Sequence, residues 1–204
     1  MNIKEISLFP TFIYHVDNIL DEKDRNKLLK DVLKEEKKIN LDHRFHTNGM
    51  DHTKKIYNCL SEKIKTLSKN IFDHHKLIYN DFEITGMWSN VMKQNNDIQI
   101  HTHPNNFLSG VYYLKADDNS PSIVFTDPRQ QSKSITPAVL ERTVHNSSVW
   151  WFKPKQNSIL FFPSWLQHHV EQNKSKEKRI SIAFNIMFNG LIGSAKELTQ
   201  STFK

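Results

Sequence analysis

The chain has 204 residues, and its 28 lysines and arginines against 22 aspartates and glutamates give a formal net charge of +6. With 37% hydrophobic and 25% charged residues, the composition is that of a folded globular protein and excludes intrinsic disorder. The length is enough for one hydrophobic core, and we expect a single domain over residues 1–204.

The cysteine content and the lengths of the apolar runs indicate the cellular compartment of the protein. The only cysteine, Cys59, has no partner for an internal disulfide, and we find neither a signal-peptide pattern nor a run of about twenty apolar residues. We therefore expect a cytoplasmic protein with no membrane partner.

The first 80 residues predict one strand and two helices that support the rest of the chain. Residues 6–16 mix β-branched and aromatic side chains around Pro10, which is typical of an edge strand interrupted by its proline. A helix is expected to begin at Asp21, and residues 40–50 are rich in turn formers and predict a loop. A second helix is expected from about residue 51 to 72, because apolar residues recur at spacings of four, four, three and four. These apolar residues are Ile56, Leu60, Ile64, Leu67 and Ile71.

Many lysines lie in this amino-terminal part, for example Lys34, Lys37, Lys38, Lys54, Lys55, Lys63, Lys65 and Lys69. Such a positive field could attract nucleic acid. The lysines fall on the polar faces of the two helices, however, and a solvated helix face explains them better.

After residue 80 the pattern changes from helical to β-rich. Short β-rich runs lie at residues 82–92, 98–103, 107–114, 122–126, 149–152, 158–162, 169–172 and 179–188. Two helices followed by about eight short strands indicate an α+β protein with a sandwich or jelly roll.

The last of these runs has two different faces. Isoleucine and phenylalanine alternate with small and polar residues, among them Arg179 and Ser181, so one face can pack under the helices while the other lines a cavity. A buried Arg179 needs an anionic partner, because an unpaired buried charge costs several kcal/mol. No acidic residue lies on that run, which points to a bound carboxylate.

Three of the 11 histidines stand out by their spacing. His101 and His103 lie two apart, and His168 follows an apolar run that ends in Pro163. Imidazoles so placed can fill one face of an iron ion and leave positions open for other ligands. His169 is less suited than His168, because alternation with Val170 sends it to the opposite side. His43 and His46 are spaced three apart in the loop, with no further partner at metal spacing.

Several segments together resemble a known family. They are Trp88-Ser89-Asn90-Val91, His101-Thr102-His103-Pro104, Leu108 to Leu114, Phe162 to Val170 and Arg179 to Asn185. By these segments the chain resembles the Fe(II)- and 2-oxoglutarate-dependent dioxygenase superfamily, in its prolyl-hydroxylase-like branch, and in particular uncharacterised bacterial and phage-borne oxygenases. The resemblance spans about residues 82–188. It implies a double-stranded β-helix, a jelly roll, at 82–188, backed by the mainly helical residues 1–80.

The resemblance also implies a metal site. His101 and His168 would be two ligands of Fe(II). The usual third ligand is the aspartate of a His-x-Asp motif, whereas this chain has His103 at that position. His103 either completes a three-histidine ligand set or leaves the position to water or substrate, and we favour ligation.

A site for 2-oxoglutarate is implied in the same way. Arg179 would pair with the distal carboxylate, since a planar guanidinium suits two parallel hydrogen bonds. Ser181 and Tyr113 would add hydroxyl hydrogen bonds, and Asn90 would line the pocket. Tyr113 and Asn90 are equally consistent with core and sheet residues.

The implied reaction is hydroxylation of an unknown substrate coupled to decarboxylation of 2-oxoglutarate to succinate and CO2. We favour a small molecule or a protein side chain as substrate, with nucleic acid as a further possibility. One alternative is a non-catalytic jelly-roll binding module, with a structural Zn(II) at the same histidines and an anionic ligand at Arg179. The other is a three-histidine dioxygenase that does not use 2-oxoglutarate. Residues 128–148, with Arg129, Lys133 and Arg142, are expected to border the site, and Trp150-Trp151 either bind substrate or pack where the loop returns.

Overall fold

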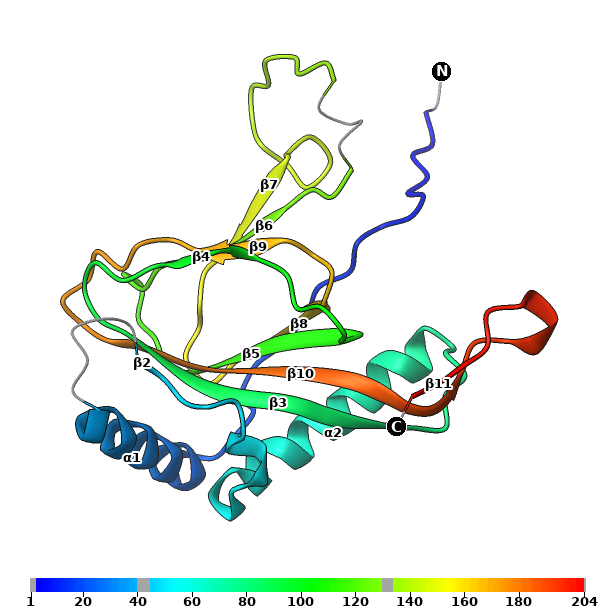
Figure 1. Cartoon of the computed structure of the whole chain (residues 1–204). Coiled ribbons are helices and arrows are strands. Elements are labelled where there is room, and N and C mark those ends of the chain that lie inside the picture. The colour runs from blue at the N-terminus through cyan, green and yellow to red at the C-terminus, as the bar shows by residue number, and fades with distance from the viewer. Residues whose placement is uncertain (1–2, 40–44, 130–133, 204) are drawn as a thin grey trace.

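Two antiparallel sheets face each other, and two helices cover the outer face of the larger sheet (Figure 1). The computed structural model describes residues 3–39, 45–129 and 134–203, so His43 and Lys133 lie outside the described residues. The larger sheet has the order β1-β8-β5-β10-β3-β2, with β11 paired to β10, and the smaller sheet has the order β4-β9-β6-β7.

The strands are β1 (Tyr14–Val16), β2 (Phe45–His46), β3 (Asp81–Met92), β4 (Ile98–His101), β5 (Leu108–Lys115), β6 (Ile123–Thr126), β7 (Val149–Phe152), β8 (Ile159–Pro163), β9 (His168–Val170), β10 (Arg179–Ile192) and β11 (Ser201–Phe203). The helices are α1 (Glu22–Ile39) and α2 (Asn58–His74), with single 3₁₀ turns at η1 (Asp51–Thr53), η2 (Lys55–Tyr57) and η4 (Ala195–Glu197).

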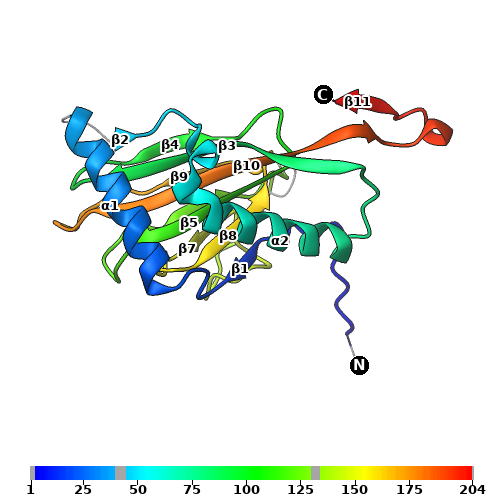
Figure 2. The ribbon, with the colours of Figure 1, turned by 90° about the horizontal axis from the view of Figure 1, so that it is seen from below.

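The first helix begins where the sequence predicts. The Asp21 carboxylate accepts a hydrogen bond from the backbone N–H of Asp24 at 2.8 Å, which satisfies a free N–H at the start of α1. Figure 2 shows α1 and α2 lying across the same face of the larger sheet. None of the helices in the described residues is long and apolar enough to cross a bilayer.

The second helix begins later than predicted, at Asn58 instead of residue 51. The two 3₁₀ turns η1 and η2 take the place of its first turns, because the Asp51 side chain points inward. Its carboxylate is fully buried and accepts hydrogen bonds from the hydroxyls of Thr47 at 2.7 Å and Ser89 at 2.8 Å. A regular helix through this segment would not present Asp51 to strand β3 in the same way.

Two further amino-terminal predictions need correction. The expected strand at residues 6–16 is reduced to Tyr14–Val16, which is consistent with Pro10 lacking a backbone donor. The expected loop at residues 40–50 contains strand β2, whose residues Phe45 and His46 pair with β3.

Strand β10 separates two hydrophobic cores. Its Ile180, Ile182, Phe184 and Ile186 are fully buried between the larger sheet and the helices, as the alternation predicts. The second core lies between the two sheets and includes Phe125 and Phe162. The cavity described below opens on this second side, so β10 supplies the helix-side core with one face and the cavity with the other.

Candidate metal centre

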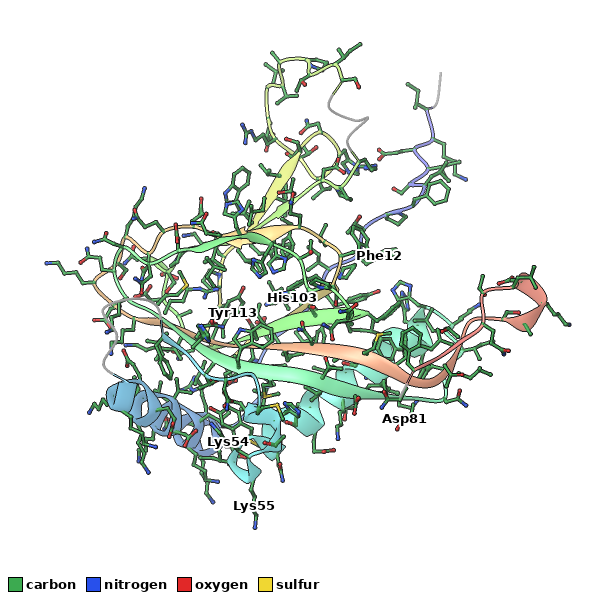
Figure 3. The ribbon with its side chains drawn as sticks, in the orientation of Figure 1. Phe12, Lys54, Lys55, Asp81, His103 and Tyr113 are labelled. Carbon is green, nitrogen blue, oxygen red and sulfur yellow. The ribbon has the colours of Figure 1, made fainter. Side chains whose placement is uncertain are left out.

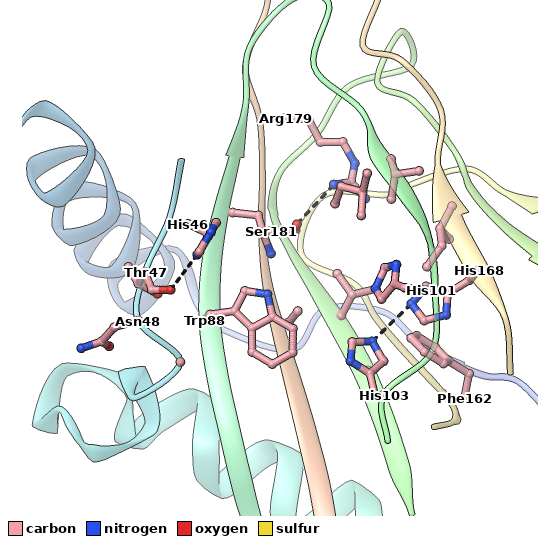
Figure 4. Close-up of a pocket in the computed structure, with 18 residues that line it drawn as sticks. His46, Thr47, Asn48, Trp88, His101, His103, Phe162, His168, Arg179 and Ser181 are labelled. Atoms are coloured by element: carbon pink, nitrogen blue, oxygen red, sulfur yellow. Dashed lines mark hydrogen bonds between the residues drawn. The ribbon is translucent and has the colours of Figure 1, made fainter. Parts of the chain in front are cut away.

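Three histidines from two separate segments meet between the sheets (Figure 4). His101 ends β4 and lies opposite His168 at the start of β9, since these two strands pair antiparallel. His103 follows two residues after His101, and its backbone N–H donates to the carbonyl of Ser164 at 2.9 Å. The ligand atoms of the three imidazoles all lie within 4.8 Å of one another. The sheet register therefore brings together residues 65 positions apart in the chain.

Backbone carbonyls fix the orientation of two of these rings. Nδ1 of His101 lies 2.7 Å from the carbonyl of Gln99, and Nδ1 of His168 lies 2.8 Å from that of Leu166. A carbonyl only accepts hydrogen bonds, so each Nδ1 carries the proton and each Nε2 keeps a free lone pair. Such second partners are typical of metal-bound histidines.

The spacing of the nitrogens fits a shared ion. Nε2 of His103 and Nε2 of His168 are 3.3 Å apart. Two nitrogens bound at right angles to one first-row metal ion, each at about 2.1 Å, are separated by about 3.0 Å. His103 and His168 are therefore spaced to share one metal ion, and His101 lies close enough to be a third ligand.

Burial keeps two of the imidazoles, those of His103 and His168, neutral. Desolvation, followed by repulsion from His101, lowers the pKa of His103 to about 4. Desolvation also lowers the pKa of His168 to about 3, and the neighbouring histidines act in the same direction. At neutral pH both rings are unprotonated, which is the form that binds metal.

Arg179 lies in the same cavity without a countercharge. Its side chain is 1% exposed, and its Nη1 donates to the Ser181 hydroxyl at 3.2 Å and contacts Met92 Sδ at 3.5 Å. Its Nε has no hydrogen-bond partner, and within the described part of the chain no carboxylate lies at ion-pair distance. Burial lowers the pKa of this guanidinium. Such an arrangement is costly unless an anion binds there.

A second buried polar group beside Arg179 also lacks a partner. The Tyr113 hydroxyl makes no hydrogen bond, and the Arg179 guanidinium carbon lies 5.1 Å from the centre of the Tyr113 ring. Burial raises the pKa of Tyr113, so its hydroxyl stays protonated and can donate. Ser181 pairs with Asn90 on one neighbouring strand and with Tyr113 on the other. The polar groups of three adjacent strands are thus gathered where a carboxylate could be bound.

One cavity contains both the histidine cluster and the Arg179 side chain. Its volume is about 480 Å³, and the three histidines, Asn90, Arg179 and Ser181 all line it. Tyr113 is buried beside it. The remaining walls include four apolar residues, Ile98, Ile123, Phe162 and Val170.

The sequence missed one wall of this cavity. Residues His46, Thr47, Asn48 and Gly49, which we call the β2 wall, line the side that Figure 4 shows across from the histidines, together with Trp88. The β2 wall reaches the cavity through the pairing of β2 with β3, a contact between residues more than 40 positions apart, which no local pattern signals. Trp88 lies on β3, and its ring centre is 5.7 Å from that of His103.

The loop at residues 128–148 does not border this cavity, contrary to the prediction. None of its described residues lines the cavity, and several of them instead line a second hollow with residues 5–13. Arg142 lies 5.7 Å from the centre of the Trp151 ring, and the Trp151 indole N–H donates to Glu171 at 3.2 Å. Trp151 therefore contacts the loop and β9 side chains outside the cavity, and neither Trp150 nor Trp151 lines the cavity.

One comparison with known proteins identifies a family. Residues 86–185, about half of the chain, match the family described as "Putative 2OG-Fe(II) oxygenase". A comparison with curated protein sequences finds no match.

Solved structures with a similar fold are distant in sequence. The crystal structure of the non-heme alpha ketoglutarate dependent epimerase SnoN from nogalamycin biosynthesis is 10% identical, with a TM-score of 0.65 over 91% of this chain and 84% of that one. A Pseudomonas putida prolyl-4-hydroxylase is 11% identical, with a TM-score of 0.60 over 87% and 93% of the two chains. The viral collagen prolyl hydroxylase vCPH from Paramecium Bursaria Chlorella virus-1, as a 2OG complex, is 14% identical, with a TM-score of 0.58 over 85% and 94%. The predicted fold, a double-stranded β-helix backed by helices, is confirmed.

Proposed function

Because the chain belongs to the Fe(II)- and 2-oxoglutarate-dependent oxygenases, we propose that it hydroxylates its substrate at a centre built from His101, His103 and His168, with formation of succinate and CO2. One observation supports the assignment of this function to these particular residues. A cluster of three imidazoles shares a cavity with a buried arginine that has no countercharge.

We assign His103 as the third ligand in place of an aspartate. Its Nε2 lies 3.3 Å from that of His168, a separation suited to two ligands of one ion. The two Nδ1 hydrogen bonds to backbone carbonyls hold His101 and His168 in the ligating orientation. The side chains are thus arranged for metal before the metal binds.

We assign Arg179 to the distal carboxylate of 2-oxoglutarate. The free Nε and the guanidinium plane offer two parallel donors, and Ser181 and Tyr113 supply hydroxyls nearby. Asn90, 4% exposed on the neighbouring strand, closes that side. A bound carboxylate would satisfy both polar groups that are now buried without partners.

The cofactors and the protein side chains have different roles in the proposed reaction. Bound Fe(II) and 2-oxoglutarate supply the oxidising chemistry. The protein binds and orients: the imidazoles keep their Nδ1 protons, Arg179 anchors the carboxylate, and the apolar residues of the cavity exclude water from the reacting groups.

Family membership argues against the first alternative, a non-catalytic binding module. The unpaired Arg179 argues against the second, because a three-histidine dioxygenase without an anionic cosubstrate has no need for a buried unpaired cation. The similar structures include a small-molecule epimerase and prolyl hydroxylases, and we expect a small molecule or a protein side chain as substrate here too. The cytoplasm remains our predicted location.

Anaerobic titration tests the proposal directly. Purified protein is loaded with Fe(II) and titrated with 2-oxoglutarate without oxygen, and the visible charge-transfer absorption of the chelate is followed. We expect the absorption to saturate at one equivalent per chain, and oxygen then to release succinate. Metal binding without the absorption would favour a structural metal or a cosubstrate-free dioxygenase.

A further inference from the structure

The cavity contains positive charge and, among its described residues, no carboxylate. Its lining includes Arg179 and four histidines but neither aspartate nor glutamate. Asp51 lies behind the β2 wall, yet it forms an ion pair with Lys54 at 2.8 Å, so it adds no net charge.

Histidine in place of aspartate changes the charge of the loaded site. Fe(II) brings two positive charges and Arg179 one, while 2-oxoglutarate brings two negative charges. With three neutral imidazoles, one positive charge remains uncompensated. An aspartate at position 103 would have cancelled it.

The apolar lining of the cavity leaves this positive charge poorly screened. The apolar residues Ile98, Ile123 and Val170 line the histidine side of the cavity, so water screens a charge there poorly. A poorly solvated charge without a partner is unfavourable and favours the binding of an anion.

The cavity also has a place for an anion apart from that of 2-oxoglutarate. Arg179 and the β2 wall lie on different parts of the lining, with Trp88 between the β2 wall and His103 (Figure 4). His46 is the basic side chain on the β2 wall, and its Nδ1 lies 3.1 Å from the carbonyl of Thr47. The wall is fixed from behind, because Thr47 Oγ1 and Ser89 both bind the buried Asp51.

We propose that the substrate carries an anionic group, which binds between the three-histidine centre and His46 and offsets the charge that His103 leaves uncompensated. This inference rests on the proposed function and adds the chemical class of the substrate. The aromatic face of Trp88 would contact the apolar part of such a substrate.

A matched pair of probes isolates the charge. Phenylacetate and phenylacetamide have nearly the same shape, but only the first is an anion at neutral pH. Their dissociation constants are measured by anaerobic calorimetry on the Fe(II) protein saturated with 2-oxoglutarate, while the charge-transfer absorption is recorded. We expect phenylacetate to bind at least tenfold more tightly than phenylacetamide, with the absorption band retained.

Three variants locate the cause. In His103→Asp the preference for the acid should fall to about twofold or less. His46→Asp should also abolish it without touching a metal ligand, whereas the neutral His46→Asn should weaken it less than His46→Asp does. His46 is exposed, so both changes are compatible with folding.

Equal affinities in the wild type, or no binding of the acid at millimolar concentration, would overturn the proposal. So would a preference that survives both aspartate variants, or loss of the charge-transfer absorption as the acid displaces 2-oxoglutarate. Failure of the proposed function gives a different result, because no absorption would then develop before any acid is added.

Discussion

At the scale of single residues, Arg179 combines a cost in stability with a role in binding. Its guanidinium is buried, and within the described residues it has no ionic partner. Replacing it by methionine removes that cost and keeps most of the side-chain volume. We expect Arg179→Met to melt at the same or a higher temperature than the wild type, and to bind 2-oxoglutarate at least about 100-fold more weakly, because charged hydrogen bonds are lost.

The two properties are measured separately, by thermal melting of the apoprotein and by anaerobic titration of the Fe(II) form. Arg179→Lys is the control, since it keeps the charge but not the planar pair of donors. We expect it to bind 2-oxoglutarate with intermediate affinity. A strongly lowered melting temperature of Arg179→Met would show that the arginine supports the fold itself.

The adjacent histidines His168 and His169 offer a matched comparison of two side chains. His168 is 3% exposed and faces the cavity, while His169 lines a groove on the other face of the same strand. Loss of one ligand from a three-ligand site is expected to weaken Ni(II) or Fe(II) binding by at least about 100-fold. We expect this of His168→Ala, whereas His169→Ala should bind metal as the wild type does. Calorimetry with Ni(II) measures both, and equal losses would mean that His168 is not a ligand.

At the scale of helices and strands, local patterns located most elements but not their long-range contacts. The alternation of Ile180 and Ile182 with Arg179 and Ser181 is a property of one strand, so the sequence predicted both faces of β10. The β2 wall was not predicted, because β2 exists only through its pairing with β3. A short strand of this kind has no pattern of its own.

The late start of α2 has a similar explanation. Apolar residues at helical spacing are present from Ile56, but the buried bonds of Asp51 to Thr47 and Ser89 decide the conformation of the first turns. Likewise, the pair His101 and His103 is visible in the sequence, whereas its meeting with His168 depends on the register of β4 against β9.

Strand β5 is packed so closely that one position admits no side chain. A Cβ atom added at Gly110 would lie 2.2 Å from the Phe184 ring and 2.5 Å from the Leu160 carbonyl. We expect Gly110→Ala to lose at least about 2 kcal/mol of the free energy of unfolding, or about 5 °C in Tm. The control is Gly86→Ala on β3, where the nearest atoms are 3.7 Å away. Thermal melts of the two variants should differ clearly, and similar values would contradict the packing described for β5.

At the scale of the whole molecule, part of the positive charge of the amino-terminal region is paired. Lys38 with Glu35, Lys54 with Asp51 and Lys69 with Asp73 form ion pairs at 2.6 to 2.8 Å. The Lys54 side chain and others extend below the larger sheet, away from the cavity (Figure 3). A solvated helix face accounts for these lysines, so the net charge of +6 does not by itself indicate a nucleic-acid substrate.

The stability of the whole metal-free protein should depend on pH through the buried histidines. The ordinary pKa of histidine is 6.5, and in the folded protein it falls to about 4 for His103 and about 3 for His168. Below pH 6.5 these histidines therefore bind protons in the unfolded chain but not in the folded protein. The stability that is present above pH 6.5 is lost as the pH falls toward 4. For His168 the loss is up to about 1.4 kcal/mol per pH unit.

We expect the Tm of the apoprotein to drop between pH 7 and pH 5, and the drop to shrink in the double variant His103→Asn, His168→Asn. Saturating Ni(II) should raise the Tm at both pH values, because it binds the neutral imidazoles of the folded state. An equal drop in the double variant would mean that groups other than these two histidines cause the acid sensitivity.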